Sequence, residues 1–84
     1  MEQKKILIVE DDQFLGEFYQ ELLLAEGYII DVAVDGEAAL QKIWQNEYEL
    51  ILLDIMLPKK DGLQILGDLK VHPAKSPNAK IVVL

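Results

Sequence analysis

Short apolar runs alternate along this chain with longer segments in which apolar residues recur every three or four positions. Two of the runs, Lys5–Val9 and Leu50–Leu53, are apolar almost throughout, which is typical of parallel strands buried on both faces. Two more runs, residues 28–34 and 81–84, complete a set of four predicted strands.

Helices are predicted in the intervals between these strands. The first, residues 13–26, has its apolar positions at Leu15, Phe18, Leu22 and Ala25, and Gly27 follows as a stop signal. The inner stripe predicted for the second helix is Ala39, Leu40, Ile43 and Trp44. The third helix, Gly62–Val71, is predicted to face inward through Leu63, Leu66 and Leu69, and residues 72–78, with two prolines, form a loop.

This alternation of strands and helices predicts an α/β protein. Repeated right-handed βαβ units give a doubly wound parallel sheet, in which ligand chemistry gathers at the carboxyl ends of the strands. The residues that immediately follow each strand are therefore the first candidates for a functional site.

Composition narrows the class of protein. The 84 residues suit one small domain, and a 51% hydrophobic content argues against disorder. No apolar run approaches the roughly 20 residues of a membrane span, no export signal is visible, and the lack of cysteine is compatible with the cytosol. A net charge of −7 has the wrong sign for binding nucleic acid. We expect a cytoplasmic domain with no direct nucleic-acid or membrane contact.

Acidic residues follow two of the strands. Glu10, Asp11 and Asp12 come directly after the first strand, and Asp54 ends the third. These two strands are commonly neighbours in a doubly wound sheet, so the carboxylates should converge and repel one another unless a cation neutralises them. An all-oxygen cluster without histidine or cysteine favours Mg²⁺ over zinc.

A carboxylate beside Mg²⁺ can act as a nucleophile toward phosphorus. Asp54 is the better candidate, because it stands alone at the end of a buried strand, whereas Glu10 and Asp11 form a pair suited to a metal. Asp12 lies where the first helix starts, and we expect it to cap that helix rather than to contact a metal.

Two segments of the chain resemble the receiver domain of bacterial two-component response regulators. They are residues 6–12, Ile-Leu-Ile-Val-Glu-Asp-Asp, and residues 52–62, Leu-Leu-Asp-Ile-Met-Leu-Pro-Lys-Lys-Asp-Gly. Residues 35–40, Asp-Gly-Glu-Ala-Ala-Leu, are similar to the family's turn into its second helix. The similarity covers the whole chain and implies a flavodoxin-like doubly wound parallel sheet with strand order 2-1-3-4.

The resemblance also implies roles at individual positions. Asp54 would be the phosphoacceptor, Asp11 would bind Mg²⁺ directly, and Glu10 would bind it directly or through water. Met56 would supply a backbone carbonyl ligand, and Pro58 and Gly62 would shape the loop beside the site. The phosphoryl donor in such a family is a phosphohistidine on a sensor histidine kinase or phosphotransfer protein, or a small donor such as acetyl phosphate. The domain is then no enzyme in the usual sense, since it catalyses at most its own phosphorylation and dephosphorylation.

The end of the chain departs from the family pattern. Receivers continue past the fourth strand with a Ser or Thr, a fourth helix, a fifth strand carrying a lysine and a closing fifth helix. Residues 1–84 are therefore expected to be an incomplete receiver domain. Without that last helix the sheet should keep an uncovered apolar face and an open edge, so we expect self-association.

The sequence leaves three alternative functions open to comparison. A pseudo-receiver or inactive fragment would act only as a protein-interaction module, but the complete set of Glu10, Asp11 and Asp54 counts against it. A haloacid-dehalogenase-like phosphatase would have a second acid where Met56 stands, and a flavodoxin proper would have a glycine- and hydroxyl-rich phosphate loop after its first strand.

Four further residues are expected to have no part in the site. Lys59 and Lys60 are expected to be solvated loop lysines rather than substitutes for the missing lysine. Trp44 is expected to be a core residue, and His72 is expected to be exposed to solvent.

Overall fold

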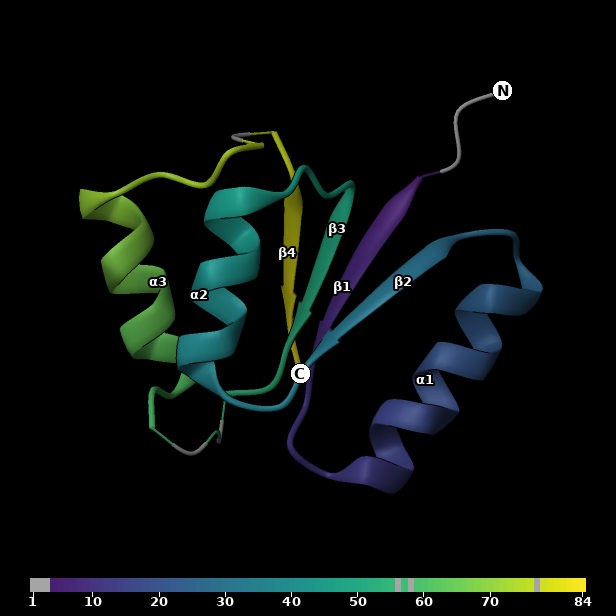
Figure 1. The fold of residues 1–84 in the computed structure, drawn as a ribbon. Helices are drawn as coiled ribbons and strands as arrows, with labels where there is room; N and C mark the ends of the chain where they lie inside the picture. Colours follow the sequence, from purple (N-terminus) through teal and green to yellow (C-terminus); the bar gives the residue numbers. More distant parts are fainter. Residues whose placement is uncertain (1–3, 56, 58, 77) are drawn as a thin grey trace.

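Four parallel strands form a single sheet in the order β2-β1-β3-β4 (Figure 1). The computed structural model describes residues 4–55, 57, 59–76 and 78–84. The strands are β1 (Lys5–Val9), β2 (Ile29–Ala33), β3 (Leu50–Leu53) and β4 (Lys80–Val83). The predicted α/β class and the strand order 2-1-3-4 are confirmed. The predicted bounds of β1 and β3 match the observed ones, and those of β2 and β4 differ by one residue at each end.

Three helices connect these strands and cover both faces of the sheet. They are α1 (Gln13–Ala25), α2 (Gly36–Gln45) and α3 (Gly62–Val71). Helix α1 lies on one face of the sheet, and α2 and α3 lie on the other (Figure 1). Helices α1 and α2 begin within four residues of the preceding strand, whereas a longer loop separates β3 from α3. Each helix is capped by an aspartate side chain that accepts a backbone N–H; the caps are Asp12, Asp35 and Asp61.

The register levels the carboxyl ends of three strands. Val9 of β1 is paired with Ala33 of β2 on one side and with Leu53 of β3 on the other. The pairing continues one residue further, because the Glu10 amide donates to Ala33 and the Asp54 amide donates to Val9, both at 3.0 Å. The residues that follow β1 and β3 are therefore brought to one edge at the same height.

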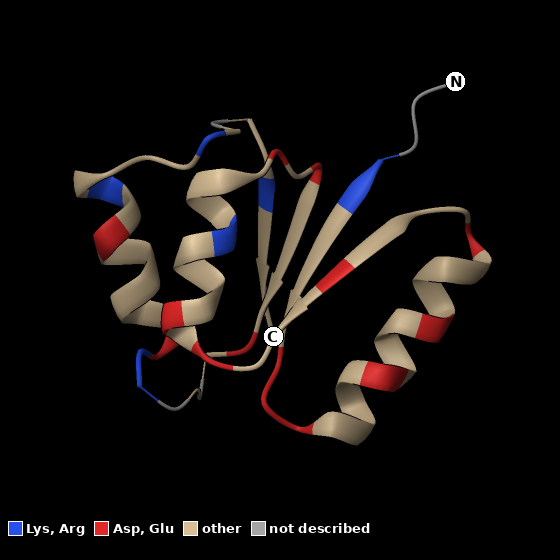
Figure 2. Ribbon diagram, in the orientation of Figure 1, with Lys and Arg blue, Asp and Glu red and all other residues tan. Residues whose placement is uncertain are grey.

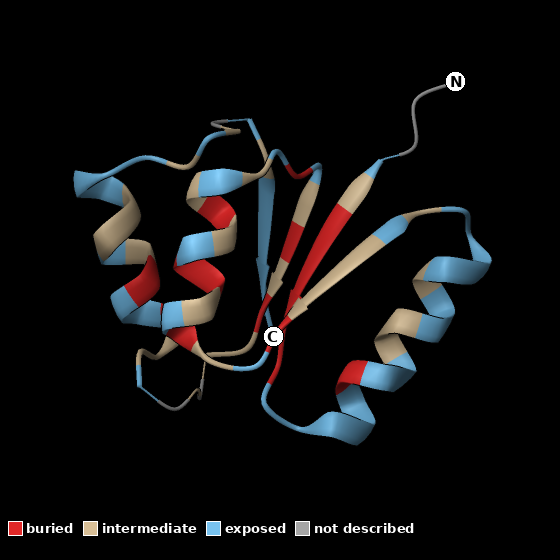
Figure 3. Ribbon diagram, viewed as in Figure 1, coloured by how far each residue is buried: buried red, intermediate tan, exposed pale blue. Residues whose placement is uncertain are grey.

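The main core lies between the sheet and the α2–α3 layer (Figure 3). Leu7 and Val9 of β1 belong to this core, whereas Ile6 and Ile8 alternate with them and point to the α1 face. All four are at most 1% exposed. The buried members of the core cluster are Leu7, Val9, Ala33, Ala39, Leu40, Ile43, Tyr48, Ile51, Leu53 and Ile65.

Helix α1 packs less completely than its sequence period suggests. Its one buried residue is Gly16, while Phe18 and Leu22 are 55% and 52% exposed. The apolar period predicted the helix correctly, but the side chains of its apolar stripe stay about half exposed. Within the same part of the chain, no helix has the length and apolar content that crossing a membrane requires.

The predicted inner face of α3 needs one correction. Leu63 was predicted to face inward but is 66% exposed. Ile65 is not part of the predicted face but is completely buried. The reason is that Gly62 sits against the strand-end backbone, where a Cβ atom would lie 2.9 Å from the Cα of Ile55. Positions three, four and seven residues after Gly62 then face inward, namely Ile65, Leu66 and Leu69.

This helix orientation predicts opposite outcomes for two alanine substitutions. Ile65→Ala should lower the free energy of unfolding by about 2–5 kcal/mol, because it leaves a cavity in the core. Leu63→Ala should change that free energy by less than about 0.5 kcal/mol, because the side chain is exposed. Urea denaturation followed by circular dichroism measures both, and equal losses would contradict the orientation described.

Candidate functional site

Three carboxylates meet at the carboxyl edge of the sheet. Glu10, Asp11 and Asp54 each offer an oxygen, and these oxygens all lie within 4.8 Å of one another. Figure 2 shows the acidic segments that follow β1 and β3 gathered at this edge, below the strand ends. The structure thus brings together the acids that the sequence predicted to converge.

The strand ends hold Glu10 in place. Its side chain is buried, with 5% exposure, and its Oε2 accepts the backbone N–H of Asp12 at 3.2 Å. Its own backbone is fixed by the amide bond to Ala33 described above. Asp54 is half-buried and Asp11 is exposed, so the cluster opens toward solvent on one side.

Burial raises the pKa of Glu10, and the neighbouring Asp54 and Asp11 carboxyls raise it further against the opposing effect of the Asp12 amide. Ionised carboxylates this close repel one another, and a divalent cation with oxygen ligands relieves that repulsion. The residues present therefore fit a Mg²⁺ ion.

Asp12 has a separate role, although it adjoins the cluster. Its Oδ1 accepts the backbone N–H groups of Phe14 at 2.9 Å and Leu15 at 3.1 Å. The prediction that Asp12 caps α1 is confirmed.

Comparison with known protein families identifies the family of this chain. The pattern that defines the response regulator receiver domain matches residues 6–84. The chain belongs to the response regulator receiver domain family. A similar curated protein is the transcriptional regulatory protein DltR of Streptococcus agalactiae, which is 41% identical over 73 residues, or 87% of this chain and 33% of DltR. HprR of Escherichia coli K12 is 46% identical over 66 residues, which are 79% of this chain and 30% of HprR.

Solved receivers have the same fold as this chain. The Francisella response regulator 1452 receiver domain superposes with a TM-score of 0.86 at 30% identity over 96% of this chain and 64% of that one. TrrA of Thermotoga maritima, solved in complex with Mg²⁺-BeF, gives 0.84 at 40% identity over 96% of this chain and 68% of TrrA. The chain spans about a third of the length of the curated relatives named above.

The loop that follows Asp54 in this receiver is closed at its base. The Gly62 amide donates to the Ile55 carbonyl at 2.9 Å, in agreement with the predicted role of Gly62 in shaping the loop. Met56 and Pro58, the predicted carbonyl ligand and loop proline, lie outside the described residues.

The two loop lysines differ from one another. The Nζ of Lys59 lies 3.5 Å from Asp35 Oδ2, and the side chain is 60% exposed, as predicted for a solvated lysine. Lys60 is half-buried and pairs with Asp68 of α3, so it is less solvated than predicted.

Trp44 and His72 form a contact that the sequence did not predict. The Trp44 indole packs against the core, donates to the His72 carbonyl at 2.8 Å, and stacks on the His72 ring at 4.6 Å. Trp44 is only half-buried, whereas His72 is exposed as predicted. No pattern of spacing signals this contact, because it depends on how α2 and α3 pack.

The electrostatics of Glu10 predict a stabilising substitution. A raised pKa in the folded state means that the stability contributed by protonated Glu10 is lost as the pH rises through that pKa, so the charged form destabilises the metal-free domain at neutral pH. Glu10→Gln imitates the protonated form and should raise the thermal midpoint in EDTA at about pH 7.

Circular dichroism melts in EDTA at neutral and mildly acidic pH check this prediction. The gain should shrink at the lower pH, and Glu47→Gln, which removes an exposed carboxylate, should produce no such gain. A lower midpoint for Glu10→Gln at neutral pH would contradict the argument.

Proposed function

We propose that this receiver domain accepts a phosphoryl group on Asp54 from a sensor histidine kinase or phosphotransfer protein in a Mg²⁺-dependent reaction. The observation that carries the proposal is the position of Asp54, at the end of a buried strand with its oxygen within 4.8 Å of those of Glu10 and Asp11. Cytoplasmic localisation stays a prediction.

Each acid has a proposed part in binding the metal. Glu10 and Asp11 would hold Mg²⁺ together with one oxygen of Asp54, and Met56 would add its backbone carbonyl as the resemblance implies. The bound ion would offset negative charge on the phosphoryl oxygens. The similar protein TrrA, solved in complex with Mg²⁺-BeF, supports this assignment.

The transfer itself uses an oxygen of Asp54. This oxygen attacks phosphorus, a P–O bond forms, and the P–N bond to the donor histidine breaks with its electron pair returning to the imidazole nitrogen. With acetyl phosphate the leaving group is acetate. The product is an aspartyl phosphate, so the chain is a substrate of its own chemistry and is not a turnover enzyme.

The competing interaction-module hypothesis requires no phosphorylation. It gives no reason for the burial of Glu10 beside two other carboxylates, an arrangement that costs stability without a cation. We therefore favour the phosphoacceptor.

Intact-mass spectrometry after incubation with acetyl phosphate tests the proposal. The parent chain should gain one phosphoryl group only when Mg²⁺ is present, and Asp54→Asn should gain none, because it lacks the nucleophilic carboxylate. Asp11→Asn should slow the gain by weakening metal binding, and Glu47→Gln, which removes an exposed carboxylate that follows α2, serves as the control that retains it. A folded parent chain that gains no mass would contradict the proposal.

We also propose that the 84-residue chain associates with a second copy of itself. The apolar face of α1 is exposed, and β4 is the last strand in the sheet order, with all four of its residues exposed. Exposed apolar surface and an unpaired strand edge are both favourable for contact between copies.

Sedimentation velocity over a range of concentrations tests this self-association. Leu22→Gln should weaken it by about tenfold or more, because burying one leucine side chain contributes about 1.5–3 kcal/mol. Leu63→Gln changes an exposed leucine on the opposite layer and should leave association unchanged. A compact monomer for the parent chain at the highest concentration would contradict the proposal.

A further inference from the structure

Gly36, the first residue of α2, lies in closer contact with a distant segment than any side chain would permit. A Cβ atom at this position would stand 2.0 Å from the Lys60 carbonyl oxygen and 2.4 Å from the Lys60 Cβ. Backbone conformation is not the reason for glycine here, since the positive φ angles of the described residues belong to Lys59 and Gly27. The constraint is space: the loop after β3 rests directly on the start of α2.

Side chains on both sides of Gly36 and Lys60 support the same contact. Asp35 caps α2 by accepting the Ala38 amide at 2.8 Å, and its other oxygen lies 3.5 Å from the Lys59 ammonium. The cap and the nearby lysine hold the pKa of Asp35 below its ordinary value. On the other side, the Lys60 ammonium pairs with Asp68 of α3.

The backbone of the loop is constrained as well. Lys59 has a φ of 65°, a left-handed conformation that non-glycine residues adopt only where the surroundings hold them. The Gly62–Ile55 hydrogen bond closes the base of this loop, and the Lys60 backbone, two residues before Gly62, rests on Gly36. The described residues that lead into α3 are therefore held both by α2 and by the backbone next to Asp54.

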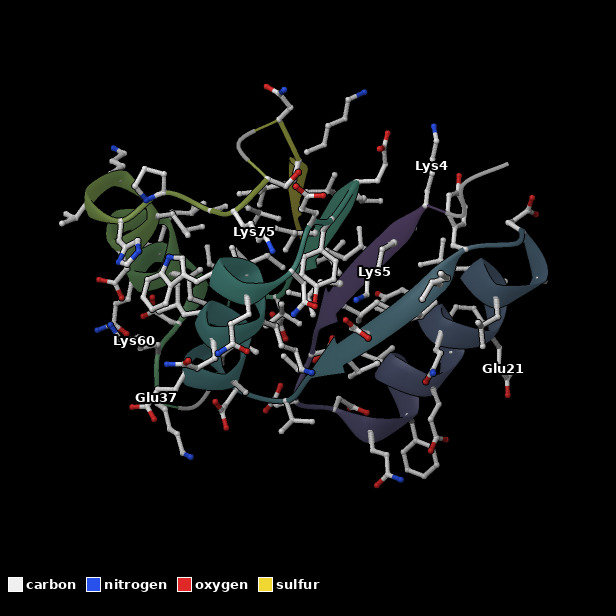
Figure 4. All side chains as sticks on the ribbon, turned by 45° about the horizontal axis from the view of Figure 1, so that its top comes forward. Lys4, Lys5, Glu21, Glu37, Lys60 and Lys75 are labelled. Atoms are coloured by element: carbon white, nitrogen blue, oxygen red, sulfur yellow. The ribbon has the colours of Figure 1, made fainter. Side chains whose placement is uncertain are left out.

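A hollow of about 380 Å³ adjoins this contact and is lined by residues of both segments, including Glu37, Trp44, Lys59 and Lys60. Figure 4 shows Glu37 of α2 and Lys60 of the loop at the same end of the molecule. Trp44 is the single tryptophan of the chain, so its fluorescence reports on displacement of the loop.

We propose that Gly36 is a positioning residue for the phosphoacceptor site, because the bare backbone of α2 at this point seats the loop that continues from Asp54. The inference rests on the proposed function and adds to it a residue outside the acidic cluster. A methyl group at position 36 must push the Lys60 backbone away. Gly62, two residues after Lys60, rests against the backbone of Ile55 and Asp54, so the displacement is transmitted to Asp54 through this contact. Substitution of a residue that orients metal ligands typically lowers metal affinity by about 10- to 100-fold.

The matched variants are Gly36→Ala and Gly67→Ala. Both add one methyl group to a helix, but a Cβ at Gly67 meets no atom within 4 Å. Gly67→Ala should also stabilise α3, since alanine favours a helix interior. Gly36→Ala is therefore made both in the parent chain and in the Gly67→Ala background, which offsets part of any loss of stability.

Two measurements are made on each variant. Tryptic cleavage after Lys59 and Lys60, compared by mass spectrometry with cleavage after Lys75 in the same sample, reports how firmly the loop is seated. Titration with Mg²⁺ alone, followed by Trp44 fluorescence and calorimetry, gives the dissociation constant. Gly36→Ala should increase relative cleavage at the loop and raise the Mg²⁺ dissociation constant about tenfold or more, while Gly67→Ala should alter neither.

The other outcomes contradict the proposal in distinguishable ways. Faster loop cleavage with unchanged Mg²⁺ affinity would mean that the contact holds the loop without positioning the site. Unchanged cleavage would mean that the loop is not seated on Gly36, and failure to fold in both backgrounds would make Gly36 a determinant of folding instead. If the parent chain binds no Mg²⁺, the proposed function fails as well, whereas equal binding by parent and Gly36→Ala overturns this inference alone.

Discussion

The level register of β2, β1 and β3 is the constraint on which the site depends. Val9 lies between Ala33 and Leu53, and the ladder extends to the amides of Glu10 and Asp54. A shift of one residue along β3 would turn Leu53 and Ile51 away from the core. Core burial therefore fixes the register, and the register in turn fixes the distance between the two acidic segments.

The same edge of the sheet carries an electrostatic cost. Glu10 is buried beside two other carboxyls, and its pKa is raised by burial and by Asp54. The core beneath it is apolar, so the domain concentrates unfavourable charge where a divalent cation would relieve it. The proposed metal binding and the stability of the metal-free fold are therefore opposed at this edge.

The two layers of helices differ in what they do for the site. Helices α2 and α3 enclose the core, and their first residues, Gly36 and Gly62, rest on the backbone of Lys60 and of Ile55 respectively. Helix α1 begins at the cap Asp12, whose amide orients Glu10, but it leaves Phe18 and Leu22 exposed. The α2–α3 layer therefore supports the proposed site, and the α1 layer presents apolar surface.

Local sequence determined the elements, the strand-end acids and the Asp12 cap, because hydrophobic period and capping chemistry depend on neighbouring residues alone. These local rules, together with the family resemblance, were enough to predict the strand order and the convergence of Glu10, Asp11 and Asp54. Only the tertiary structure decided that α3 buries Ile65 instead of Leu63, that Lys60 pairs with Asp68, and that Lys60 rests on Gly36. These contacts join different elements of the fold. Their geometry follows from how the helices, the loop and the sheet pack against one another.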